Sequence, residues 1–407
     1  MISPKAIAGR RSATILAAIT IGYFVFSLRW ALLPFPRELG IKLSRHRPPL
    51  QPFPKPPTLS GLIPPVALAP PATVLDPTDP SCDPFVSAFV ALNRSKPIRT
   101  TFSSLHPDCK PANPSWFAQL KLSADAPIVA LQNRTVLFVG DSVDRFLVDD
   151  VCRLLQGNLV LHPVTTYASS VSGAPTGAGG LPRTCQISGP SGRQNLTLAS
   201  YFFYGYDVAD LWRDKKATWA PPANFPPRWA AFARAYGTLF RPGSLAGSRP
   251  DLVVANVGLW ELARFDRLHE RAHNGVAAPT TLPAEFVDAF VEDTVDFLAR
   301  VRKLVGPQAA VRWRQMHTLW SAEGSYFTQA GKKHGRPRFS PVKVAALNAA
   351  AKEAVRRAGG VGWWPVGEMI LPWPAEWWLR DAIHQSGTVG AVVWGGGVLE
   401  YLARTPR

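Results

Sequence analysis

Residues 81–407 of this sequence predict an α/β domain with a mostly parallel sheet of about five strands between two layers of helices. Two observations support this prediction. Short apolar runs alternate with longer amphipathic patterns, as in chains that build a parallel sheet. Polar residues follow directly after several of these runs, where open α/β sheets place their chemistry. We therefore expect one catalytic domain, although 407 residues could also hold two ordinary ones.

The predicted elements alternate along the domain. Strands are expected at 136–139, 196–204, 252–256, 310–314 and 361–365. Helices are expected at 143–155, 227–240, 284–304, 342–358 and 389–402. Three glycines, Gly395–Gly397, weaken the last of these helices. Apart from the helix at 227–240, segments 205–250 and 264–283 are expected to be irregular and to shape a substrate cleft.

The most informative motif is Gly140-Asp141-Ser142, which ends the first apolar run and opens a helical pattern. A serine in such a turn exposes its hydroxyl, while backbone N–H groups and the positive helix end face a developing oxyanion. These residue types suit nucleophilic acyl transfer. The competing interpretation is a helix cap or turn, in which Gly-Asp-Ser is also common.

Two later stretches favour the catalytic interpretation. Asn256 ends another buried-strand pattern, and Asp381 and His384 stand three residues apart beyond the last predicted strand. A serine nucleophile needs a base for its proton, and a histidine base needs an acceptor that holds its tautomer. A short Asp-x-x-His turn supplies both groups.

This set of motifs resembles the GDSL/SGNH superfamily, and more narrowly its PC-esterase branch. That branch contains the trichome-birefringence-like polysaccharide O-acetyltransferases and the fungal capsule O-acetylation proteins. The resemblance implies a three-layer SGNH-hydrolase-like fold with Ser142 as nucleophile, His384 as base and Asp381 as the acid that orients it. It implies that Asn256 and the Ser142 backbone stabilise the oxyanion, with no bound cofactor and no metal. The further oxyanion donor is left open among three glycines: Gly173, Gly177 and Gly205.

Three residues are candidates for substrate binding. Arg145 lies three residues after Ser142, so a helix places both on one face. It either positions oxygens of the substrate or braces Asp141 or a nearby loop. Gly258 and Trp260 follow the predicted oxyanion residue closely and complete the set.

A second Asp-x-x-His, Asp266 to His269, tests how specific the spacing is. It follows Asn256 by only ten residues, in a charged stretch that reads as a solvated helix or loop. The resemblance expects the catalytic pair after the last strand and before a terminal helix. Only Asp381 and His384 satisfy this, and we favour them.

The first 80 residues predict a membrane anchor and a spacer. We expect a cytosolic tail at 1–11, an uncleaved transmembrane signal anchor at 12–33 and a proline-rich extended stem at 34–80. Basic residues after the span outnumber those before it, which by the charge rule alone favours the opposite orientation.

Other features favour a catalytic domain in the lumen of the Golgi or another secretory compartment. N-glycosylation sequons stand at Asn93, Asn133 and Asn195. An even number of cysteines without Cys-x-x-Cys spacing predicts two disulfides, with three connectivities open, among Cys82, Cys109, Cys152 and Cys185.

The formal net charge of +17 is spread along the chain. No basic helix with interleaved aromatics stands out, so we expect acidic glycans or anionic head groups rather than nucleic acid as partners. Three function classes remain: a glycan O-acyltransferase, a carbohydrate esterase with the same residues, and a silent glycan-binding relative. The intact motifs disfavour the last. The anchor and the resemblance favour transfer, which requires an acyl donor and another membrane protein or carrier to supply it.

Overall fold

The structure is a computed structural model. It describes residues 82–104, 109, 112–122, 127–162, 181–208, 211, 225–241, 243–244, 246–247, 249–318, 339–374, 377–381 and 383–405. The predicted cytosolic tail, signal anchor and stem lie outside these residues, as do Gly173 and Gly177. Within the described part of the chain, no helix has the length and apolar character needed to cross a bilayer.

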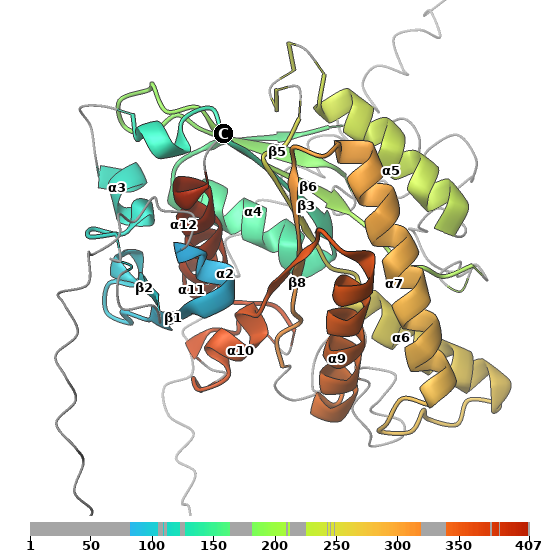
Figure 1. The fold of residues 1–407 in the computed structure, drawn as a ribbon. Helices are drawn as coiled ribbons and strands as arrows, with labels where there is room; N and C mark the ends of the chain where they lie inside the picture. The colour runs from blue at the N-terminus through green and yellow to red at the C-terminus, as the bar shows by residue number, and fades with distance from the viewer. Residues whose placement is uncertain are drawn as a thin grey trace, which may run out of the picture. The chain divides into compact units, whose positions relative to one another are not determined.

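The domain is an α/β fold around a seven-stranded mixed sheet in the order β4-β5-β6-β3-β7-β8-β9 (Figure 1). Its strands are β3 (Thr135–Gly140), β4 (Asn158–Leu161), β5 (Arg183–Ile187), β6 (Leu196–Phe202), β7 (Leu252–Ala255), β8 (Ala310–Arg314) and β9 (Gly362–Trp364). From β6 to β9 the strands are parallel, whereas β4 and β5 run antiparallel at one edge. The prediction of about five strands therefore missed the two strands at this edge. A separate hairpin joins β1 (Ala88–Ala91) to β2 (Thr101–Ser104).

The central strand β3 contributes side chains to two cores. Leu137 and Val139 pack into one hydrophobic cluster, and Val136 and Phe138 pack into the other. This division follows from the two-residue period of a strand, which sends successive side chains to opposite faces. All six residues of β3 are buried, as the apolar run predicts.

Helices cover both faces of the sheet. One core is completed by α5 (Phe225–Leu239), α6 (Gly258–Ala272), α7 (Ala284–Val305) and α9 (Pro341–Ala358). The other is completed mainly by α3 (Trp116–Leu122), α4 (Ser142–Leu154) and α12 (Gly396–Arg404). Figure 1 shows α5, α7 and α9 on one side of the strands and α4 and α12 on the other. Shorter helices are α2 (Pro84–Ser87), α10 (Val366–Ile370) and α11 (Gly387–Gly390).

Two predictions about helices need correction. The stretch after residue 264 was expected to be irregular, but α6 continues to Ala272. Leu262 and Phe265 are buried there, and so is the Asp266 carboxylate, which pairs with Lys343, whereas Arg271 is exposed. The terminal helix forms in three parts, with a π-helical turn at Ala391–Gly395 between α11 and α12. Glycine is needed there, because a Cβ on Gly396 would collide with the Phe102 ring.

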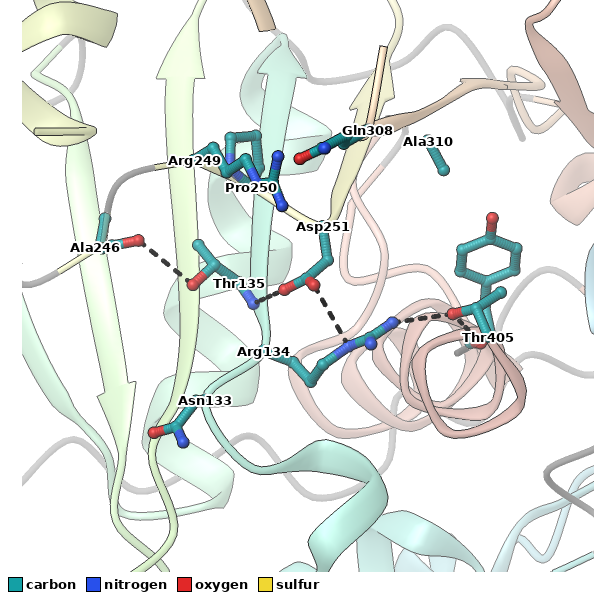
Figure 2. A pocket seen from close by; sticks show the side chains of 12 residues that line it. Asn133, Arg134, Thr135, Ala246, Arg249, Pro250, Asp251, Gln308, Ala310 and Thr405 are labelled. Atoms are coloured by element: carbon teal, nitrogen blue, oxygen red, sulfur yellow. Dashed lines mark hydrogen bonds and ion pairs between the residues drawn. The ribbon is translucent and has the colours of Figure 1, made fainter. Parts of the chain in front are cut away.

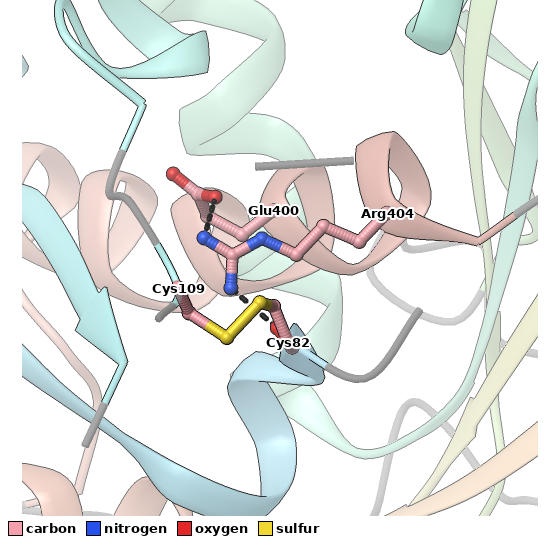
Figure 3. Close-up of a disulfide and its surroundings, with 4 residues drawn as sticks. All are labelled: Cys82, Cys109, Glu400 and Arg404. Carbon is pink, nitrogen blue, oxygen red and sulfur yellow. Dashed lines mark hydrogen bonds and ion pairs between the residues drawn. A yellow bond between two sulfur atoms is a disulfide. The ribbon is translucent and has the colours of Figure 1, made fainter. Parts of the chain in front are cut away.

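Both expected disulfides are present. Cys82 bonds to Cys109, and Cys152 bonds to Cys185, with Cα–Cα distances of 5.6 and 5.7 Å. The second disulfide joins α4 to the antiparallel strand β5. Figure 3 shows the first one beside the end of α12, where the Arg404 guanidinium donates to the Cys82 carbonyl.

Glu400 is a buried carboxylate beside this first disulfide. It forms an ion pair with Arg404 at 2.9 Å (Figure 3). It also accepts a hydrogen bond from the Trp116 indole at 3.1 Å, and it is 2% exposed. Burial raises its pKa to about 7 in spite of the attraction of Arg404. Because the folded pKa lies above the unfolded one, the neutral form stabilises the fold below about pH 4.5, and this contribution is lost as the pH rises through 7.

We expect Glu400→Gln to remove this pH dependence. Between pH 4 and pH 8 the free energy of unfolding of the wild type should fall relative to the variant by about 3 kcal/mol, the size of the pKa shift. Urea unfolding of both proteins at several pH values measures the difference. A constant difference between the two curves would contradict the assignment.

Candidate active site

Ser142 is the first residue of α4, directly after the carboxyl end of β3. Asp141 caps this helix by accepting a hydrogen bond from the Val143 amide at 2.8 Å. Gly140 is required because a Cβ there would collide with the Asp144 carboxylate. The sharp strand-to-helix turn therefore presents the serine at the helix N-terminus, where the helix dipole favours negative charge.

His384 faces this serine. Its Nε2 lies 2.7 Å from the Ser142 Oγ, and its Nδ1 lies 2.8 Å from the Asp381 Oδ2. The three side chains thus form a continuous hydrogen-bonded chain in the order of a serine–histidine–acid triad.

The carboxylate of Asp381 is held ionised. Partial burial favours its neutral form, but hydrogen bonds from the His384 ring and from the backbone amides of His384 and Ile383 outweigh burial and lower its pKa to about 2. Above pH 2 this carboxylate can therefore fix the Nδ1–H tautomer of the imidazole, which leaves Nε2 free to accept the serine proton.

Two buried side chains fasten the Asp-x-x-His turn to the domain. Gln385 donates to the Val143 carbonyl on the first turn of α4 at 2.8 Å. His317 follows β8, and burial lowers its pKa to about 3, so its neutral ring donates to the Ile383 carbonyl at 2.6 Å. The turn is thereby fixed to the nucleophile's own helix and to the sheet.

Asn256 directly follows β7, which pairs with β3, the strand that leads to Ser142. Its amide N–H donates to the Val139 carbonyl of β3 at 3.0 Å, and its side chain is fully buried. Its Oδ1 accepts from the Gly258 amide at 3.0 Å, and its Nδ2 donates to the Arg314 carbonyl at 2.5 Å. These two bonds fix the orientation of the side-chain amide, whose second N–H remains for another acceptor.

Gly205 is the one candidate glycine among the described residues. It lies in the loop after β6, where the Phe203 amide donates to the Gly140 carbonyl at 2.7 Å. The loop therefore runs beside the turn that carries the nucleophile. A positive φ of 79° and the nearby Glu261 carboxylate both require glycine at position 205. The same carboxylate accepts from the Tyr206 amide at 2.7 Å and holds the loop.

A buried ion pair supports the nucleophile turn, and the sequence analysis did not predict it. The Arg314 guanidinium binds both oxygens of Asp144 at 2.7 and 2.8 Å, and both side chains are 1% exposed. Asp141 lies 4.0 Å from the same guanidinium. Burial, together with the charge of Asp144, raises the pKa of Asp141 to about 6. The only sequence signal was the position of Arg314 at the carboxyl end of an apolar strand.

The predicted substrate residues differ in accessibility. Arg145 is partly exposed and lies over the rings of Phe146 and Phe202. Trp260 is 5% exposed and packs edge-on against Tyr204, so it offers little surface to a substrate. Gly258 supports Asn256 through its amide, as described above.

The second Asp-x-x-His does not form a pair. Asp266 binds the Lys343 ammonium at 2.6 Å, while His269 packs against His273 with ring centroids 4.2 Å apart. In the described part of the chain, His, Cys, Asp and Glu do not gather in groups of three suited to a metal ion. The expected absence of a metal stays a prediction.

A cavity lies at the opposite ends of the parallel strands from Ser142. This cavity, of about 950 Å³, lies at the amino ends of β3, β7 and β8 (Figure 2). There Asp251 accepts from the Thr135 amide at 2.7 Å and pairs with Arg134, which donates to Thr405 at 2.9 Å. These contacts tie the beginnings of the strands to α12. Ser142 stands at the other ends of the strands, so this cavity is separate from the candidate site.

No protein-family model matches this chain, and no curated protein matches it significantly. Three solved structures are similar to part of it. A GDSL-like lipase from Parabacteroides merdae shares 12% identity over 67% of this chain and 100% of its own, with a TM-score of 0.32. A DUF4886 family protein from Bacteroides uniformis shares 12% over 67% and 83%, with a TM-score of 0.33. A peptidoglycan O-acetylesterase shares 13% over 67% and 92%, with a TM-score of 0.31.

We expect Asn256→Ala to lower kcat for acyl transfer by about a hundredfold to a thousandfold, the usual cost of one oxyanion donor. KM should change little, because the lost bond belongs to the transition state. Steady-state kinetics with an activated acetyl ester measures both constants. Trp260→Phe is the matched control, since it changes a neighbouring buried residue of α6 without touching the amide. A change in KM alone would remove Asn256 from the oxyanion site.

Proposed function

We propose that this protein is an O-acyltransferase that moves an acetyl group onto a glycan hydroxyl through an acyl-Ser142 intermediate. The single observation that carries the acyl chemistry is the hydrogen-bonded chain from Ser142 through His384 to Asp381. A capping serine needs no such base at 2.7 Å from its hydroxyl, so the chain argues against the purely structural interpretation of Gly140-Asp141-Ser142.

In the first step the Ser142 Oγ attacks the carbonyl carbon of the acyl donor, and its proton passes to the Nε2 of His384. The negative charge on the carbonyl oxygen is stabilised by the Ser142 amide, the Asn256 side chain and the Gly205 amide. When the tetrahedral intermediate collapses, His384 returns the proton to the leaving group. In the second step His384 takes a proton from the acceptor hydroxyl, whose oxygen attacks the carbonyl carbon of the acyl-serine. When this second tetrahedral intermediate collapses, the bond to the Ser142 Oγ breaks and His384 returns the proton to that oxygen.

The choice of a sugar hydroxyl over water rests on the resemblance of the motifs to the PC-esterase branch. With water as the acceptor, the same residues would act as a carbohydrate esterase. The two disulfides fit an oxidising compartment, and we propose a lumenal domain, in the Golgi or elsewhere in the secretory pathway, held by the N-terminal segment. A separate membrane protein would then supply the acetyl donor.

Mass spectrometry of the purified protein tests the proposal. Incubation with p-nitrophenyl acetate should give an acetyl adduct on the peptide that contains Ser142. Addition of xylan or pectin oligosaccharides should clear the adduct and give acetylated oligosaccharides. Clearance at the same rate without any oligosaccharide would assign the protein as an esterase, and failure to form an adduct would overturn acyl chemistry at this serine.

A further inference from the structure

An aromatic ring flanked by two guanidiniums lies beside the His384 imidazole of the candidate site. Phe146 lies on the first turn of α4, and its ring meets the His384 ring edge-on with centroids 4.8 Å apart. The Arg145 Cζ lies 4.6 Å from the Phe146 ring centroid, and the Arg380 Cζ lies 4.7 Å from it. Both positive charges therefore lie against the ring that contacts the His384 imidazole, although they come from segments more than 200 residues apart.

Two further arginines pair with carboxylates of α4. Arg183 binds both oxygens of Asp149 at 2.8 and 2.6 Å. Asp150 is shared between Arg380 and Arg153. The Arg380 Nε also donates to the Gln385 carbonyl at 2.6 Å, which leaves its Nη1 group for a ligand. Burial, and next the positive charge of Arg183, lower the pKa of Arg145 although Asp149 attracts it. A negative charge that arrives here would relieve this repulsion.

We propose that the glycan bound at this site is anionic, and that Arg145 and Arg380 bind a uronate carboxylate on a sugar next to the one that reacts. This inference rests on the proposed function. A guanidinium that stacks on an aromatic face can use its N–H edge for two parallel bonds to a carboxylate, which a single ammonium cannot match. The net charge of +17 adds long-range attraction for such a polymer.

Binding without turnover tests the inference. Full-length protein with Ser142→Ala is titrated by calorimetry with polygalacturonate, dextran and dextran sulfate. We expect it to bind polygalacturonate and to bind neutral dextran at least tenfold more weakly. Adding Arg145→Gln should weaken polygalacturonate binding by about tenfold, as is typical when a charged hydrogen bond is lost. Arg145→Lys should not restore the affinity, because it keeps the charge and loses the fork.

Arg193→Gln is the matched control for charge. This exposed arginine lies in the turn before β6, about 20 Å along that strand from the candidate site. An equal loss of affinity in Arg193→Gln would show that binding depends on the overall positive charge of the protein, and it would overturn the inference. Equal binding of dextran, or binding of dextran sulfate alone, would overturn it as well. An acetyl adduct on the wild type reports on the proposed function separately, so the two can fail independently.

Discussion

Ser142→Ala is expected to abolish the covalent acetyl adduct and to lower kcat by about 10⁴-fold or more, because it removes the hydroxyl that lies 2.7 Å from the His384 Nε2. His384→Ala should cost nearly as much. The two side chains act as a unit, so the double variant should be no slower than either single variant. Adduct formation and single-turnover kinetics with an activated acetyl ester measure these effects.

The second Asp-x-x-His supplies the control for this prediction. His269→Ala removes a histidine with the same sequence spacing. Its neighbour Asp266 binds Lys343, and His269 itself lies on α6 and packs against His273. We expect its kcat to stay within about twofold of the wild type, in line with a site away from the chemistry. If His269→Ala and His384→Ala lost activity equally, the assignment of the base would be wrong.

The sequence predicted the parts of the fold that obey simple periodicity. Both β3 and β7 are continuous apolar runs, and their burial on two faces follows from strand geometry. The antiparallel edge pair escaped prediction for a physical reason. In β5 the polar residues Arg183 and Thr184 are buried, so the strand shows no apolar pattern. β4 has only four residues, and its short apolar run at 159–161 is mostly exposed.

The candidate site shows a similar division. The order of motifs predicted that Ser142, Asp381 and His384 would meet, since all follow strands of one parallel sheet, and the structure brings them within hydrogen-bond distance. Their catalytic roles stay predictions. The supports were not predictable, because Arg314, His317 and Gln385 act through tertiary contacts between segments that are distant along the chain. The glycosylation sites and the N-terminal anchor also stay predictions.

The Asp144–Arg314 pair gives the largest expected effect on stability. Arg314→Met leaves the Asp144 carboxylate buried without its partner, and removing one member of a buried ion pair costs about 3–5 kcal/mol. Asp141 also loses a positive neighbour. The pKa of Asp141, which burial already raises, should then rise further in the folded state, because Arg314 no longer lowers it. A raised folded pKa means that the destabilisation grows as the pH rises, so we expect a smaller loss at pH 5 than at pH 8.

Urea unfolding of three variants at both pH values separates this effect from lost packing. Arg314→Met combined with Asp144→Leu removes both charges and should recover much of the loss, because an apolar pair carries no desolvation cost. Arg300→Met, which breaks an exposed pair with Asp296 on α7, should cost less than about 1 kcal/mol. A loss of that small size in Arg314→Met, with no dependence on pH, would contradict the role of the pair. If the expected loss is found, the turn that carries Ser142 depends on the guanidinium of Arg314, which binds Asp144. The carbonyl of the same arginine accepts from the Asn256 side chain, so Arg314 supports both Ser142 and Asn256.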